Sequence, residues 1–137
     1  MGAVIDSLIA GMPVMVTHFL AAIGILVAGI AVYNAVTPFH ELKLIREGNA
    51  AAGVSAAGAT VGLALPIAGA LAGSVNIYDL LIWGTVALLV QLFTFTIVAA
   101  LVRRLVEAIT RGEMASALLL AGVQISVGLI NAAAVRG

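Results

Sequence analysis

Residues 44–52, LIREGNAAA, join a short, charged, amphipathic segment to a helix rich in alanine and glycine. The amphipathic segment ends at Gly48, and the apolar helix begins two residues later. A related junction follows 64 residues on, where Ile109 and Gly112 take the places of Ile45 and Gly48. A change from charged to apolar residues is typical of a chain that passes from a membrane surface into hydrocarbon. The sequence therefore predicts a fold organised around two such junctions.

The composition is that of an integral membrane protein. Of the 137 residues, 64% are hydrophobic and 9% are charged, and the mean hydropathy is +1.25. Ordinary soluble domains carry roughly 25% charged residues, so this chain has too few polar side chains to cover a soluble body. The six basic and six acidic residues balance, which gives no reason to expect a nucleic-acid partner. The absence of cysteine excludes disulfides, thiol catalysis and cysteine metal sites.

Four apolar runs each have close to the roughly 20 residues that a helix needs to cross the hydrocarbon core. None of them contains Asp, Glu, Lys or Arg, and none shows the alternation of polar and apolar residues that barrel strands have. The sequence thus predicts an all-α polytopic protein with four transmembrane helices and the lipid bilayer as its surroundings. The runs lie at about Val14–Val36, Ala50–Ala72, Leu80–Val102 and Met114–Ala134.

The first dozen residues differ from a secretory signal, because they lack a positive region and carry Asp6 instead. Val4, Leu8 and Met12 fall on one helical face, which favours a short helix lying on the membrane surface. Pro13 then predicts a break before the first transmembrane helix.

Positive charges predict the orientation of the helices in the membrane. Loops rich in Lys and Arg stay in the cytoplasm, and the loop at residues 73–79 has no positive charge. We therefore expect a bacterial inner-membrane protein with the loops 37–49 and 103–113 in the cytoplasm and both termini on the periplasmic side. The basic residues of these two loops are Lys43, Arg46, Arg103, Arg104 and Arg111.

An ungapped shift of 64 residues aligns the two halves of the chain, which we treat as one membrane domain. It superposes Gly48 on Gly112 and Gly58 on Gly122, together with the hydropathy pattern. The predicted first repeat covers residues 1–72, including the N-terminal surface helix, and the second covers residues 73–137. Because each repeat has two transmembrane helices, both copies should insert in the same direction, as parallel repeats do in transporters.

The second transmembrane run carries a stripe of small residues. Gly58 and Gly62, and again Gly69 and Gly73, have the small-xxx-small spacing that lets two helix backbones approach closely. The first interpretation is helix packing, within one chain or between copies of it. A glycine-lined pathway is the alternative.

Three amides lie inside the last two runs. Gln91 and Gln124 are near the midpoints of their helices and should share one depth, and Asn131 lies on the same face as Gln124. An amide in hydrocarbon seeks a hydrogen-bond partner, so Gln91 is expected to bond to Gln124 or to a second copy. A polar solute site at the membrane midplane is the other interpretation.

Polar residues at the junctions are candidate sites of a third kind. Gly48 and Gly112 are predicted to stop the short helices, and Asn49 and Glu113 then occupy helix starts, where an amide caps well and an acid is favoured by the helix dipole. Glu41 could pair near Lys43 or meet a cytoplasmic partner, and the sequence does not choose. His18 is expected to be an interfacial polar residue.

Several of these residues also carry a resemblance to a known family. The chain resembles domain-of-unknown-function family 350, the YjfL-type small bacterial inner-membrane proteins. The resemblance implies the same location and a four-helix, two-repeat layout, and it carries over no activity, cofactor or catalytic residue. Because family members are often encoded beside membrane-stress proteins, it also implies a partner of that class in the cytoplasm. The matching residues are Thr37-Pro38, Glu41-x-x-Leu44-Ile45-x-x-Gly48-Asn49-x-Ala51-Ala52, Gly58, Trp83-Gly84 and Gln91-Leu92.

Two hypotheses of function follow. The first is a homo-oligomeric membrane or envelope component that is not an enzyme, has no cofactor or metal site, and uses its basic loops to contact a partner or anionic lipid. The alternative is a small transporter or channel subunit with a solute path near Gln91 and Gln124.

Overall fold

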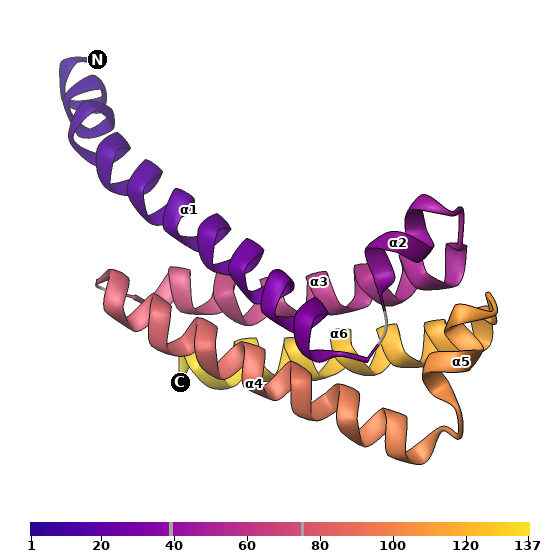
Figure 1. Ribbon diagram of the computed structural model, residues 1–137. Coiled ribbons are helices and arrows are strands. Elements are labelled where there is room, and N and C mark those ends of the chain that lie inside the picture. Colours follow the sequence, from indigo (N-terminus) through magenta and orange to yellow (C-terminus); the bar gives the residue numbers. More distant parts are fainter. Residues whose placement is uncertain (39, 75) are drawn as a thin grey trace.

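The computed structural model describes residues 1–38, 40–74 and 76–137, which form six α-helices and no strand (Figure 1). Four of the helices are long and apolar enough to cross a membrane, so the predicted all-α fold with four transmembrane helices is confirmed. The two remaining helices have six residues each and lie between the long ones. The helices are α1 (Gly2–Val36), α2 (Glu41–Arg46), α3 (Ala50–Gly73), α4 (Ile77–Leu101), α5 (Leu105–Thr110) and α6 (Met114–Arg136).

The helices α3 and α6 form the centre of the bundle and make its most extensive contact. They run in the same direction, because Gly58 lies against Ala121 and Gly69 lies against Ala132 further along both helices. Helix α4 packs on both of them, and α1 packs on α3 and α4. The short helices α2 and α5 lie together at one end of the bundle, which we call the junction end (Figure 1).

Helix α1 is continuous from Gly2 to Val36, so the predicted break at Pro13 and the separate surface helix are wrong. Proline removes one backbone donor, but a helix in an apolar environment can continue through it when its neighbours supply other bonds. The Thr17 hydroxyl also donates to the Pro13 carbonyl oxygen at 2.7 Å, but this bond within the helix does not replace the donor that is lost at Pro13. The N-terminal half of α1 extends away from the bundle (Figure 1), and residues 1–17 are all exposed.

The second half of the chain repeats the element order of the first. The bounds of α5 are those of α2 shifted by 64 residues, and α6 begins 64 residues after α3. Gly48 and Gly112 both have φ of +85°, a conformation that a side chain makes costly. Matching backbone bonds close both short helices: Gly48 N to Ile45 O (3.0 Å), Asn49 N to Leu44 O (2.9 Å), Gly112 N to Ile109 O (2.9 Å) and Glu113 N to Ala108 O (2.9 Å). This is the hydrogen-bond pattern of a helix that ends at a glycine. The two-repeat architecture itself stays a prediction.

Candidate functional site

Glycines of α3 allow the close approach of α6. A Cβ added to Gly58 would meet the Ala121 main chain, and one added to Gly69 would lie 2.9 Å from the Ala132 carbonyl oxygen. Gly128 of α6 is equally tight, because its Cβ would lie 2.5 Å from the Gly62 carbonyl oxygen. Gly73, the fourth glycine of the predicted stripe, has nothing within 4 Å of such a Cβ. The contact therefore runs along three of the four glycines and ends before the last turn of α3.

The two midplane glutamines meet at Gly62. Gln91 Nε2 donates to the backbone oxygen of Gln124 at 3.0 Å, so the expected bond reaches the main chain of that residue and not its side chain. A Cβ on Gly62 would lie 2.6 Å from Gln91 Nε2, which shows that the amide lies directly on the glycine. Gln124 Nε2 in turn donates to the Tyr33 hydroxyl oxygen at 2.6 Å. Both glutamines are fully buried, and the chain of bonds connects α4, α6 and α1.

Sequence reasoning did not single out Tyr33, although this residue completes the buried network. Its side chain is 1% exposed and packs edge-on against Phe95, with ring centroids 6.1 Å apart. A tyrosine in an apolar run seeks a partner for its hydroxyl, and this was the signal that could have found it. Three buried atoms of the amides have no hydrogen-bond partner in the described part of the chain: Gln91 Oε1, Gln124 Oε1 and Asn131 Nδ2. Asn131 is therefore not bonded to the pair through this atom.

Asn49 links the two junctions. Its Oδ1 accepts from the Ala52 backbone N–H at 3.0 Å, which makes it the N-cap of α3 as predicted. Its Nδ2 donates to the carbonyl oxygens of Ile109 and Thr110, both at 3.0 Å, at the C-terminal end of α5. Glu113, at the start of α6, makes no side-chain cap bond and pairs with Arg111 at 2.9 Å. The equivalent positions thus have different roles.

Glu41 is the most unusual residue of the junction end. It is 2% exposed, and Ser55 Oγ of α3 donates to its Oε1 at 3.2 Å. It does not pair near Lys43, as one of the two expectations had it, because Lys43 Nζ lies by Glu47 Oε1 at 4.0 Å. Burial raises the pKa of the Glu41 carboxyl from its ordinary value of 4.5 to about 7, against an opposing effect of the Ser55 hydrogen bond. A cleft of about 500 Å³ lies beside it, lined by Asn34, His40, Glu41, Leu42 and Lys43.

The basic residues of the junction end are mostly paired within the chain. Arg104 Nε lies 2.9 Å from Glu107, and Lys43 and Arg111 pair with Glu47 and Glu113. Arg46 and Arg103 are exposed and form no ion pair among the described residues. Ion pairs at an exposed surface contribute at most about 1 kcal/mol each, so these pairs matter more for the charge they neutralise than for stability.

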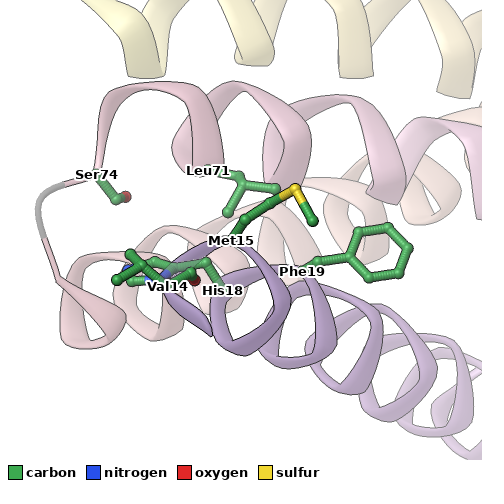
Figure 2. Close-up of a pocket in the computed structure, with 6 residues that line it drawn as sticks. All are labelled: Val14, Met15, His18, Phe19, Leu71 and Ser74. Carbon is green, nitrogen blue, oxygen red and sulfur yellow. Dashed lines mark hydrogen bonds between the residues drawn. The ribbon is translucent and has the colours of Figure 1, made fainter. Parts of the chain in front are cut away.

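His18 lies far from the junction end, in a crevice where α1 leaves the bundle. Figure 2 shows it with Val14, Met15 and Phe19 of α1, facing Leu71 and Ser74 at the end of α3. The crevice has a volume of about 390 Å³. His18 Nδ1 is 2.9 Å from the Val14 carbonyl oxygen one turn back, so one ring nitrogen bonds to its own helix. Among the described residues no group of three or more His, Cys, Asp or Glu side chains could hold a metal ion.

Comparison with known proteins identifies the family. The family described as Domain of Unknown Function (DUF350) matches residues 7–135. The chain belongs to the DUF350 family. It is also 28% identical over 130 residues to a protein named UPF0719 inner membrane protein YjfL in Escherichia coli strain K12, and equally to that of strain O157:H7. These matches cover 95% of this chain and 96% of the relatives. No solved structure matches the chain. Its four long apolar helices are typical of a multi-pass membrane protein, and the relatives that it matches are named inner membrane proteins.

Proposed function

We propose that this DUF350 protein is a homo-oligomeric component of the inner membrane and not an enzyme. One observation carries the proposal: the bundle is closed at its midplane, whereas half of α1 has no neighbour in the chain. Gln91 and Gln124 use their amide protons inside one chain and lie directly on the α3 backbone. The first half of α1 presents exposed large apolar side chains, among them Leu8, Ile9 and Met12. Another copy that covers this segment gives it the packing that the bundle does not provide.

Cross-linking through α1 tests this proposal. The chain has no cysteine, so a single Leu8→Cys substitution places one thiol on the uncovered segment. We expect it to form disulfide-linked dimers in native membranes. Leu118→Cys is the matched control, because Leu118 is 56% exposed and Leu8 is 54% exposed, but Leu118 lies on the central helix α6. A monomer by native mass spectrometry, together with equal cross-linking of both variants, would refute the oligomer.

We further propose that the junction end faces the cytoplasm and that both termini face the periplasm, as the positive charges predict. Arg46 and Arg103 are then the residues that meet a partner, expected to be a membrane-stress protein, or anionic lipid. Labelling of Ser74→Cys by a membrane-impermeant reagent from the periplasmic side tests the orientation, and labelling from the cytoplasm only would reverse it. Arg46→Gln with Arg103→Gln should weaken association with the partner or lipid. Lys43→Gln with Arg111→Gln, which removes paired charges, should weaken it less.

The alternative, a small transporter or channel subunit, is favoured by one separate observation. Two carbonyl oxygens near the midplane, Gln91 Oε1 and Gln124 Oε1, are buried with no partner among the described residues. Buried carbonyl oxygens normally have one, and a solute or water could supply it. Gln91→Leu with Gln124→Leu distinguishes the two functions. A folded variant with unchanged solute uptake in proteoliposomes supports the structural role, and a folded variant that loses uptake supports transport.

A further inference from the structure

Glu41 occupies a position where packing alone does not require an acid. Leu105 lies 64 residues later, at the first residue of α5, just as Glu41 is the first residue of α2. Both side chains are 2% exposed. An apolar side chain therefore satisfies the same place in the second half of the fold. The carboxyl group at this place in the first half needs a reason other than filling space.

The charge of an ionised Glu41 has no cationic partner among the described residues. Among the described residues, the Glu41 carboxyl group accepts one hydrogen bond, from the Ser55 hydroxyl. The other titratable groups near it are Tyr33 of α1, and His40 and Lys43 of its own segment. Lys43 is directed to Glu47 and is largely exposed, and α3 contributes Ser55, which does not titrate. A buried carboxylate without a cation is costly, and such a group binds a proton instead.

We propose that Glu41 is a proton-binding site, reached through the adjacent cleft, by which the protein responds to the pH of the compartment that faces the junction end. The cleft gives water access to the edge of the site, since His40 and Lys43 on its wall are exposed. Protonation removes the buried charge and holds α2 against α3, and release of the proton into the cleft weakens that contact. Helix α5 has no buried carboxyl group, because its Glu107 is exposed, so only the contact of α2 should change with pH.

Infrared difference spectroscopy of the full chain in lipid nanodiscs tests this proposal directly. Between pH 5 and pH 9 we expect the C=O band of one protonated carboxyl group to disappear with a midpoint near pH 7. The band should be absent in Glu41→Gln and unchanged in Glu47→Gln, whose side chain is 57% exposed. The absence of any carboxyl group that titrates above pH 6, or a band that persists in Glu41→Gln, would overturn the proposal.

Ser55→Ala keeps the proposal testable if Glu41→Gln does not fold. The Ser55 hydroxyl stabilises the ionised carboxylate, so its loss should raise the midpoint by about one pH unit. A midpoint that stays unchanged in Ser55→Ala contradicts the assignment of the band to Glu41. The titration is then repeated with Na⁺ in place of choline at constant ionic strength. A midpoint that falls with Na⁺ identifies a sodium ion as the ligand and overturns the assignment to a proton.

Discussion

At the junction of α2 and α3 a glycine with φ of +85° separates two helices, and at the junction of α5 and α6 another glycine with the same φ does so. The backbone bonds around the two glycines also match. The side chains do not: Glu41 and Asn49 of the first junction stand where the second has Leu105 and Glu113. The backbone geometry thus needs only the glycines. The polar groups of the first junction do something that this geometry does not require.

The largest expected difference between the halves concerns Gly58 and Gly122, which are also 64 residues apart. Gly58→Ala should destabilise the bundle by about 3 kcal/mol or prevent folding, because the new Cβ would overlap the Ala121 main chain. Gly122→Ala adds a Cβ with nothing within 4 Å, and should stabilise its helix by up to about 1 kcal/mol. Thermal or detergent unfolding in bicelles measures both variants. Equal losses of stability in the two variants would contradict the asymmetric packing of Gly58 and Gly122.

The second largest effect is expected when the residues at positions 41 and 105 are exchanged, because one is an acid and the other is apolar. Because burial raises the folded-state pKa of Glu41 from 4.5 to about 7, the ionised form costs the native state up to about 3 kcal/mol above pH 7. The folded state therefore holds a proton that the unfolded state has lost, and stability falls as pH rises from about 4.5 to about 7.

Glu41→Leu should remove this slope and raise stability at pH 8. Leu105→Glu should add a similar slope to the second junction, where the place of Ser55 is taken by the exposed Leu119. Unfolding curves at pH 5 and pH 8 check both variants. A wild-type protein with equal stability at the two pH values would contradict the assignment of the slope to Glu41.

A smaller difference is expected between Asn49 and Glu113. Asn49→Ala loses the cap of α3 and the two bonds to α5, which should cost about 2 kcal/mol. Glu113→Ala loses one exposed ion pair and should cost less than about 0.5 kcal/mol. Hydrogen exchange at the Ala52 amide provides a local measurement, since only Asn49→Ala should accelerate it. Slow exchange in that variant would mean that another group caps the helix.

The smallest expected difference is between Gly48 and Gly112, where the two junctions should behave alike. Each substitution to Ala forces a side chain into the left-handed region with free space around it, and should cost about 1 kcal/mol. Parallel unfolding curves of the two single variants test this. A clear difference between the stability losses of the two variants would mean that the backbone of one junction can relax around the new side chain and that of the other cannot.

Local patterns in the sequence predicted those parts of the molecule that are determined by residues close to one another along the chain. The four apolar runs predicted the long helices, and Gly48 and Gly112 predicted the ends of the short ones. Pro13 misled, because proline predicts a break in water more reliably than in an apolar helix. The predicted break at Pro13 was therefore wrong because it relied on the behaviour of proline in water-exposed helices.

The candidate site could be predicted less well, because it depends on contacts between distant residues. The burial of Glu41 results from the packing of α2 on α3, and Ser55 lies 14 residues away from it. Tyr33 reaches Gln124 across 91 residues. Helical spacing placed Gly69 and Gly73 on the same stripe, but only Gly69 lies where α6 is close. A single sequence can mark a polar residue in an apolar run, but it does not show which distant residue will be packed against it.

The length of α1 has a consequence for the membrane itself. Its 35 residues make a helix of about 52 Å at 1.5 Å per residue, whereas the hydrocarbon core is about 30 Å thick. The other three long helices, with 23 to 25 residues, are close to the length that a bilayer accommodates. Hydrophobic mismatch is thus confined to a single helix, which responds by tilting or by thickening the lipid around it. Because α1 already leaves the bundle obliquely (Figure 1), a thicker bilayer allows it to stand more upright and a thinner one inclines it further. The angle between α1 and the bundle therefore depends on the thickness of the surrounding lipid.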